Sequence, residues 1–318
     1  VVSTRITAPG WTRLYRNNGN GTFTDVSAAM GIDTTRGALG VQWVDYDNDG
    51  DVDLFLHGFD YSLLYRNDGT SFSDVAHAVG LTRTLAAAST VWQDFDNDGD
   101  LDVWYGGHGP PSAIYRNDGG TFSDATAGSG LGEFTGFHAG SAADYDQDGD
   151  IDFYSASDEA ARLCLFRNNQ SGNNWFQVQL VGQRSPPYSV PRDATNSRLE
   201  LFFGGRRLVQ QVDGGHEGHQ AEQHSPVLHY GLSSVSSIDS LVVRWTDGSR
   251  FVLSGDGVEV NRRYLLHYPS VLDRLSPCHP TVAVPQPQPV EQVGRASLRA
   301  SSGRRSLSLH FQGISQIG

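Results

Sequence analysis

The stretch "DYDNDGDVD", Asp45 to Asp53, places five aspartates in nine residues. "DFDNDGDLD" follows at Asp94 and "DYDQDGDID" at Asp144, so near-copies start 49 and 50 residues apart. Like charges this close repel one another strongly unless a cation lies among them. The pattern therefore predicts a fold built from equal units, each carrying a cation site.

Other segments repeat with the same period. "LYRNNGNGTFTDVSAAMGI" begins at Leu14, "LYRNDGTSFSDVAHAVGL" at Leu64, "IYRNDGGTFSDATAGSGL" at Ile114, and "LFRNNQSGNNWF" at Leu165 before it diverges. Each period reads as four short strands bounded by the Asp-rich loop, a Gly or Pro break and "NDG". In the first full period these strands are predicted at residues 41–44, 53–57, 63–66 and 71–75.

Four strands per unit favour the blade of a β-propeller over the alternatives, a stack of hairpins or a β-solenoid. About 13 strands are visible along the repeats, whereas a closed propeller needs at least about four blades of four strands. We therefore expect an all-β chain with a partial, truncated propeller. Its ring would be completed by further repeats of a longer protein or by another chain, including self-association.

The composition agrees with an all-β protein. The chain has 318 residues, which suits about two domains, and 37 Gly but one Met, as in turn-rich β proteins. Fifteen of its 36 acidic residues lie in the three loops, and the net charge of −13 argues against a basic nucleic-acid-binding face. No apolar run approaches the roughly 20 residues of a membrane span, and no signal peptide is visible. Because Val1 is not a natural start, the chain is expected to be processed or truncated.

The loop pattern D-x-D-x-D-G-D-x-D suits calcium. Side chains at positions 1, 3 and 5 can converge, Gly at position 6 permits a sharp turn, position 7 offers its carbonyl, and position 9 closes the shell. All donors are hard oxygens, so zinc and copper are not indicated. An EF-hand is excluded because position 12 is not Glu and the flanks are strand-like. One such loop would also fit a solvated acidic turn, but three in register favour about three Ca²⁺ sites.

These motifs resemble the FG-GAP/VCBS repeats of extracellular propellers, including the calcium loops of integrin α subunits, over roughly residues 11–168. The "LYRN-DG-TFxDV" element resembles the branch found in cartilage acidic protein. The resemblance implies side-chain ligands at positions 1, 3, 5 and 9: Asp45, Asp47, Asp49 and Asp53; Asp94, Asp96, Asp98 and Asp102; Asp144, Asp146, Asp148 and Asp152. Position 7, occupied by Asp51, Asp100 and Asp150, is expected to bind through its main-chain oxygen, with the side chain facing water.

The pattern changes after residue 172. "NWFQVQLVG", "SRLELFFGG", "RRLVQQVDGG", "VLHYGLSS" and "DSLVVRWTDG" alternate apolar and polar residues between Gly-rich turns, which predicts a small antiparallel β domain. Their order resembles the ASPIC/UnbV domain, with departures at "RDATNSR" and "HEGHQAEQH", so a ligand of the latter loop would differ here. We expect repeats over 1–170, this domain over 171–268, a Pro-rich linker over 269–292, and a partial or disordered segment over 293–318.

Few other side chains suggest chemistry. The loop with His216, His219 and His224 reads as a metal or acid–base site or as a polar exposed loop, the latter being favoured. Cys164 and Cys278 are too few for a disulfide framework, although a bridge between them stays open. No nucleophile elbow, phosphate loop or reactive cysteine context is present, so no catalytic residue is predicted.

The sequence thus predicts a calcium-binding, non-enzymatic interaction or adhesion protein. Millimolar Ca²⁺ outside cells would fill even weak sites, so we expect a secreted, cell-surface or periplasmic location. The partner is a protein or a glycan, with no nucleic acid and no membrane span. Two alternatives are kept: a Ca²⁺-dependent lectin, and a carbohydrate lyase or hydratase using His57, His108 and His138, which are more simply read as loop residues.

Overall fold

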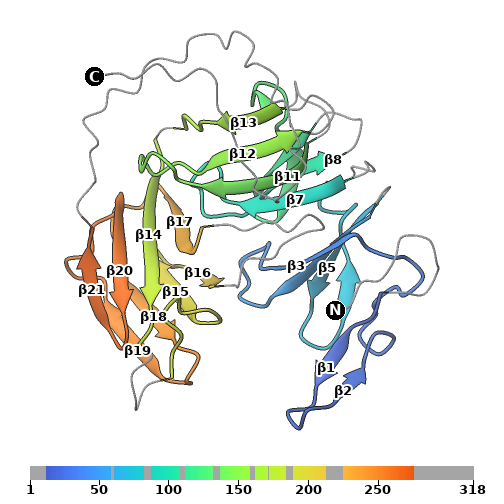
Figure 1. Ribbon diagram of the computed structural model, residues 1–318, viewed down its shortest axis with the longest axis horizontal. Helices are drawn as coiled ribbons and strands as arrows, with labels where there is room; N and C mark the ends of the chain where they lie inside the picture. Colours follow the sequence, from blue (N-terminus) through green and yellow to red (C-terminus); the bar gives the residue numbers. More distant parts are fainter. Residues whose placement is uncertain are drawn as a thin grey trace, which may run out of the picture. The chain divides into compact units, whose positions relative to one another are not determined.

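The computed structural model describes residues 12–58, 61–81, 87–107, 112–131, 137–157, 162–170, 172–183, 189–212 and 225–275. The chain divides into a unit of residues 1–275 and a unit of residues 276–318, and every described residue belongs to the first. The described residues form 21 strands in six sheets and no α-helix, which confirms the all-β class (Figure 1).

The repeats form four sheets, each with neighbouring strands antiparallel and in chain order. Their strands are β1 (Tyr15–Asn17) and β2 (Phe23–Asp25); β3 (Gly40–Val44), β4 (Asp53–His57), β5 (Ser62–Asn67) and β6 (Phe72–Asp74); β7 (Ala87–Gln93), β8 (Asp102–Gly107), β9 (Ala113–Asp118) and β10 (Thr121–Asp124); β11 (Phe137–Ala143), β12 (Asp152–Ser157) and β13 (Arg162–Phe166). The predicted 13 strands, grouped as two, four, four and three, are confirmed as propeller blades.

Aromatic side chains fill the space between successive sheets. Phe55 on β4 packs edge-on against Trp92 on β7, with ring centroids 5.1 Å apart. Trp104 on β8 lies 4.4 Å from Phe153 on β12, measured between ring centroids. Large aromatic groups contribute much of the apolar area that a small core buries. Each sheet is therefore held mainly by contact with the next sheet along the chain.

The second half contains two more four-stranded sheets. One has the order β17-β14-β20-β21 and the other β16-β15-β18-β19. Their bounds are β14 (Asn174–Val181), β15 (Arg198–Phe203), β16 (Arg206–Gln211), β17 (Val227–Ser233), β18 (Ser240–Arg244), β19 (Arg250–Ser254), β20 (Arg262–His267) and β21 (Val271–Arg274). Phe176, Phe203 and Tyr230 are fully buried in the shared core of this domain.

Two features of this domain correct the sequence analysis. β14 pairs with β20 in parallel, so the domain is not wholly antiparallel. β21 pairs with β20 beyond Tyr268, so the domain continues into the segment that was predicted to be a linker.

Several predictions lie outside the described residues, namely the loop with His216, His219 and His224, and any bridge from Cys164 to Cys278. Within the described residues, no helix has the length and hydrophobicity that crossing a lipid bilayer requires.

Candidate metal centre

Each Asp-rich loop connects the first and second strands of a sheet and is closed by a strand pair. In the first loop, Val44 on β3 pairs with Asp53 on β4. The loop turns back on itself because position 4 is left-handed, with φ near 60° at Asn48, Asn97 and Gln147. Gly50 at position 6 also has positive φ, 94°, which a residue with a Cβ adopts only at a cost. The sequence thus folds each loop into a small ring.

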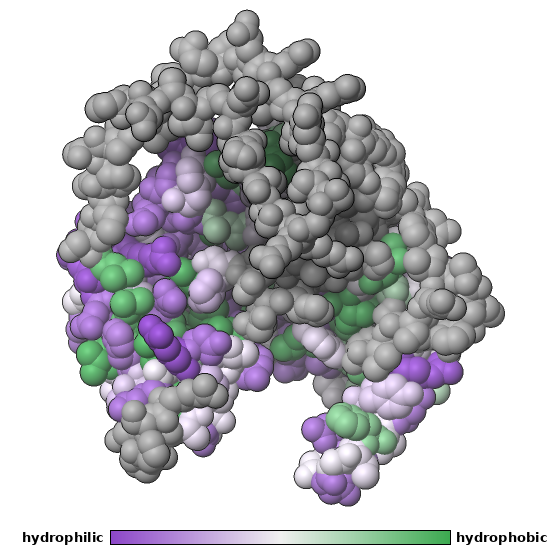
Figure 2. Space-filling model, in the orientation of Figure 1, coloured by the Kyte–Doolittle hydropathy of each residue, from purple (hydrophilic) through white to green (hydrophobic). Residues whose placement is uncertain are grey.

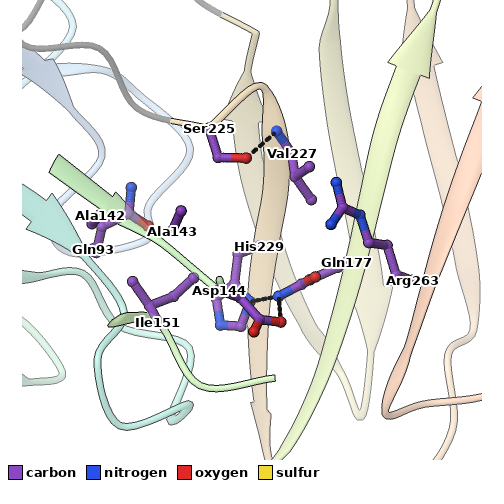
Figure 3. A pocket seen from close by; sticks show the side chains of 10 residues that line it. All are labelled: Gln93, Ala142, Ala143, Asp144, Ile151, Gln177, Ser225, Val227, His229 and Arg263. Atoms are coloured by element: carbon purple, nitrogen blue, oxygen red, sulfur yellow. Dashed lines mark hydrogen bonds between the residues drawn. The ribbon is translucent and has the colours of Figure 1, made fainter. Parts of the chain in front are cut away.

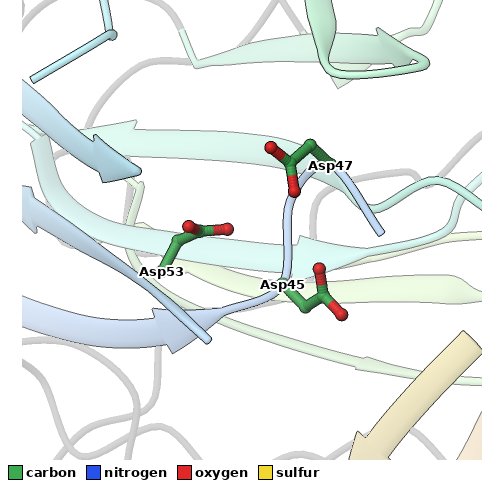
Figure 4. A group of neighbouring side chains, drawn as sticks. All are labelled: Asp45, Asp47 and Asp53. Carbon is green, nitrogen blue, oxygen red and sulfur yellow. The ribbon is translucent and has the colours of Figure 1, made fainter. Parts of the chain in front are cut away.

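Three carboxylates converge in every loop. The groups are Asp45, Asp47 and Asp53; Asp94, Asp96 and Asp102; and Asp144, Asp146 and Asp152. In each group one oxygen per residue lies within 4.8 Å of the others. Oxygens bound to Ca²⁺ at about 2.4 Å are separated by up to about 4.8 Å, so this spacing fits such an ion. Figure 4 shows the first group, in which two aspartates come from the loop and one from the start of β4.

Two of the three groups contain a buried oxygen that has no hydrogen-bond donor among the described residues. Asp45 Oδ1 and Asp146 Oδ1 are buried and accept no hydrogen bond from the described residues. A buried polar atom without a partner is costly. The donor set consists of carboxylate oxygens alone, which suits a hard cation. The residues present therefore fit a metal ion at each loop.

The electrostatics agree with this geometry. Burial, with a smaller contribution from neighbouring carboxylates, raises the pKa of Asp45 to about 6 and that of Asp53 to about 7. Burial likewise raises the pKa of Asp152 to about 7 and that of Asp94 well above its usual range. The local environment thus disfavours the charged forms unless a cation compensates them.

Backbone N–H groups orient the position 9 carboxylate, and the "LYRN" element supplies one of them. Asp53 accepts hydrogen bonds from the N–H groups of Tyr46, at 3.2 Å, and Asn67, at 2.8 Å. The same two bonds recur at Asp102 and Asp152. The residue at the Asn position of "LYRN" therefore holds a proposed ligand in place through its backbone N–H.

The same Asn also connects successive loops. Asn117 Nδ2 donates to the carbonyl of Leu101 in its own loop and to that of Tyr46 in the preceding loop. Asn168 makes the equivalent bonds to Ile151 and Phe95. The loops are thus tied into one row.

Positions 5 and 7 differ from the sequence-based expectation. Asp49, Asp98 and Asp148 at position 5 lie outside the three-carboxylate groups, and their Oδ1 atoms accept the N–H of position 7 instead. At position 7, Asp51 is exposed as expected, but Asp100 and Asp150 are buried. Their side chains do not face water because residues of the preceding loop bind them.

Position 4, which the sequence pattern did not single out as functional, makes these links. Asn48 Nδ2 donates to Asp100 Oδ1, at 2.8 Å, and to the carbonyl of Gly99. Asn97 repeats the arrangement with Asp150 Oδ1, at 3.0 Å, and the carbonyl of Gly149. The signal was the amide side chain that stands at position 4 of all three loops.

Arginines of the "LYRN" elements lie beside position 3. Arg167 Nε is 2.8 Å from Asp146 Oδ2, and Arg116 Nε is 3.7 Å from Asp96 Oδ2. Both arginines are about half exposed, so they screen the loop charge only from its solvent side. The converging carboxylate oxygens of each group lie within 4.8 Å of one another.

The second domain contacts the second loop directly. The Gly231 N–H donates to Asp94 Oδ2 at 3.0 Å, and the Ser233 N–H donates to the Asn97 carbonyl at 2.9 Å. Arg206 donates to the Asp98 carbonyl and to Asp100 Oδ1. One carboxylate, Asp94, thus belongs both to the three-carboxylate group and to the contact with β17.

A small pocket marks the contact with the third loop. Its lining includes Asp144, Gln177, His229 and Arg263 (Figure 3). Gln177 Nε2 donates to Asp144 Oδ2, at 2.9 Å, and lies 3.2 Å from His229 Nδ1. His229 Nε2 is 2.7 Å from Asn97 Oδ1, which fits a neutral imidazole protonated at Nε2. These side chains link the second and third loops through the second domain.

Of the three histidines of the alternative enzymatic reading, only His57 has a described side chain. His57 is not a loop residue: it ends β4 and is buried beside Gly40. His138 lies on β11, and His108 lies outside the described residues. Burial lowers the pKa of His229 to about 3, so this imidazole stays neutral near pH 7.

Comparisons with known proteins agree with both halves of the fold. The family model described as "FG-GAP-like repeat" matches residues 1–56, 46–105 and 94–155, and the model described as "ASPIC and UnbV" matches residues 188–272. None of the curated proteins compared with this chain matches it.

Two solved structures are similar to the chain at low identity. One is an Agrocybe aegerita lectin that recognises non-reducing terminal N-acetylglucosamine: 20% identity, TM-score 0.33, 77% of this chain and 74% of the lectin covered. The other is a protein proposed to act in cell adhesion, from Bacteroides uniformis: 9% identity, TM-score 0.22, 74% and 88% covered. The repeats, the three loops and the matched second domain together identify the chain as an FG-GAP-repeat protein with a C-terminal ASPIC/UnbV domain.

Proposed function

We propose that the chain is an extracellular interaction protein whose blades are stabilised by Ca²⁺. The observation that supports this most strongly is the recurrence of one three-carboxylate group, with oxygens within 4.8 Å of one another, in three consecutive loops. Positions 1, 3 and 9 would supply side-chain oxygens and position 7 its carbonyl, and the ion would supply the positive charge that these groups lack.

The proposed ion has a structural role because each loop is a junction. The loops contact one another through position 4 and through the Asn of "LYRN". All three also contact the second domain, through the Gly50 carbonyl, Asp94 and Asp144. An ion that fixes these carboxylates would therefore hold the neighbouring sheet and the second domain in place as well.

We further propose binding rather than catalysis, outside the cell. Millimolar Ca²⁺ saturates sites of modest affinity there. His229 uses both ring nitrogens in structural contacts, which supports a non-enzymatic role for this buried imidazole.

Isothermal titration calorimetry of the metal-free chain tests the proposal. We expect uptake of about three Ca²⁺, with Mg²⁺ binding more weakly because it requires a strict octahedral shell. A chain carrying Asp47→Asn, Asp96→Asn and Asp146→Asn is the matched control and should take up little Ca²⁺. Absence of heat with the unchanged chain would overturn the metal assignment.

The partner class is tested separately. Binding of the Ca²⁺-loaded chain to a glycan array and to immobilised matrix proteins, with and without EDTA, separates a lectin from a protein binder. Binding that occurs equally with and without EDTA would contradict a role for the ions in presenting the interaction surface.

A further inference from the structure

The second domain contacts all three loops, but with groups of different charge. At the second and third loops it presents neutral donors to the position 1 carboxylate: the Gly231 N–H donates to Asp94 Oδ2 at 3.0 Å, and Gln177 Nε2 donates to Asp144 Oδ2 at 2.9 Å. At the first loop the group that reaches the junction is the guanidinium of Arg198, on β15. The three loops therefore differ in the charge that the second domain brings to them.

Hydrogen bonds connect Arg198 to the first loop. Arg198 Nη2 donates to the Gly50 carbonyl at 3.3 Å, and the Gly50 N–H donates to Asp45 Oδ2 at 3.1 Å. The Arg198 side chain is only partly exposed, and its Nε is buried without an acceptor among the described residues. Asp45 Oδ1 is buried and likewise lacks a donor there. An incompletely satisfied cation and an incompletely satisfied carboxylate thus bind the same glycine.

Arg198 differs from its neighbours in having no acidic partner. Arg207 Nε lies 3.1 Å from Glu200 Oε2, and Arg206 Nη2, at the second loop, lies 2.8 Å from Asp100 Oδ1. Within the described ranges, Arg198 forms no ion pair. Its charge is therefore available to act on the first loop.

The electrostatics of Asp45 show this action. Burial raises the pKa of Asp45, and among the smaller contributions the positive charge of Arg198 lowers it. The arginines of "LYRN" do not single out one loop, because Arg66, Arg116 and Arg167 stand beside position 3 of the first, second and third loops. These side chains are between 44% and 53% exposed, so solvent screens their charges more than that of the partly buried Arg198.

We propose that Arg198 is a built-in counter-ion of the first loop and makes this loop the weakest of the three Ca²⁺ sites. A guanidinium keeps its charge at neutral pH, so it repels a second cation that binds beside Asp45. The neutral donors at Asp94 and Asp144 exert no such repulsion. The second and third loops would therefore fill first as Ca²⁺ rises. The inference rests on the proposed function, because it concerns the affinity of the same sites.

Full-length variants with one intact loop isolate the first site. Asp96→Asn with Asp146→Asn gives a first-loop chain, in which only the first loop keeps all its carboxylates. Asp47→Asn with Asp146→Asn gives the corresponding second-loop chain. In the first-loop chain, Arg198→Met removes the charge and keeps an apolar stem, whereas Arg198→Lys keeps a charge at the same place.

Arg250→Met in the first-loop chain is the matched control for the loss of a positive charge from the second domain. Arg250 is exposed on β19, and in the described part of the chain its side chain forms no hydrogen bond or ion pair with a loop. Figure 2 shows hydrophilic and hydrophobic residues interspersed over the visible surface of this domain, so one exposed arginine there is unexceptional.

Isothermal titration calorimetry with Ca²⁺ compares these chains. The first-loop chain should bind Ca²⁺ more weakly than the second-loop chain, and Arg198→Met should raise its affinity by about fivefold or more. Arg198→Lys and Arg250→Met should change it by less than about twofold. Equal affinities of the two single-loop chains, an unchanged affinity in Arg198→Met, or an equal gain in Arg198→Lys would overturn this inference and leave the metal assignment intact. Absence of Ca²⁺ uptake by every chain would overturn both.

Discussion

At the scale of single residues, the five carboxylates of one loop have different roles. Positions 1, 3 and 9 converge, position 5 accepts a backbone N–H, and position 7 carries a contact to the preceding loop where one exists. Asp100 and Asp51 both occupy position 7, yet Asp100 is buried and Asp51 exposed. A substitution at position 7 therefore has no uniform effect.

Asp47→Asn should weaken Ca²⁺ binding at the first loop by about tenfold or more, about 1.4 kcal/mol, because it removes a charged oxygen from the group. Asp51→Asn is the matched control and should change affinity by less than about twofold, since its side chain is exposed and its carbonyl remains. Calorimetric titration of both variants provides the comparison. Equal losses would show that the loop binds its ion through another set of oxygens.

The pH dependence of the metal-free chain follows from the raised pKa values. Asp53 and Asp152 have pKa values near 7 in the folded chain, above about 3.9 when unfolded, so the folded state binds their protons more tightly. Their contribution to stability is complete below about pH 3.9 and is lost as the pH rises through about 7. The lowered pKa of His229 acts in the opposite direction below about 6.5, but the raised carboxyls outnumber it.

In EDTA, the chain should therefore melt at a lower temperature at pH 7.5 than at pH 5.5, and Ca²⁺ should remove or reverse the difference. Thermal melts at both pH values, with and without Ca²⁺, measure this. A metal-free chain that is more stable at pH 7.5 would contradict the buried, uncompensated state of the carboxylates.

At the scale of elements, the contact between β17 and the loops couples the two domains. His229→Leu would remove the hydrogen bonds to Asn97 and Gln177 and leave the buried Asn97 Oδ1 without the donor that it binds, while Gln177 keeps its bond to Asp144. We expect a loss of about 1–3 kcal/mol in the free energy of unfolding, with weaker Ca²⁺ binding at the second and third loops only. His267→Leu on β20, where the imidazole is partly exposed, is the control and should be near neutral. Chemical denaturation and calorimetry test both changes. An unaltered Ca²⁺ affinity of the second loop in His229→Leu would refute the coupling.

Turn signals and the alternation of apolar residues predicted those strands whose positions depend on nearby residues in the chain. The strands of the repeats were visible because turn signals and alternation recur every 50 residues, and β14 to β18 because apolar residues alternate between Gly-rich turns. The parallel pair β14 and β20 was not, since it joins segments about 86 residues apart, as in the bond from the Asn261 N–H to the Trp175 carbonyl. The burial of Asp100 could not be predicted from the sequence either, because it depends on Asn48 in another repeat.

At the scale of the whole molecule, stability depends on contacts that pass from one repeat to the next. The aromatic pairs between sheets and the row of hydrogen-bonded loops connect the same neighbours. Calcium at the loops would therefore stabilise the entire row rather than one turn. A free Ca²⁺ concentration of 100 times the Kd adds about 2.7 kcal/mol per site to the free energy of unfolding, if the ion binds only the folded state.

Differential scanning calorimetry of the full chain in Ca²⁺ and in EDTA, beside the variant carrying Asp47→Asn, Asp96→Asn and Asp146→Asn, tests this central claim most directly. Three sites of this strength should raise the melting temperature by about 10 °C or more, since 1 kcal/mol corresponds to about 2–4 °C for a domain of this size. The triple variant should show a much smaller shift, since a site weakened tenfold adds only about 1.4 kcal/mol at the same Ca²⁺ concentration. An unchanged chain with the same melting temperature in Ca²⁺ and in EDTA would contradict the claim that calcium holds the blades together.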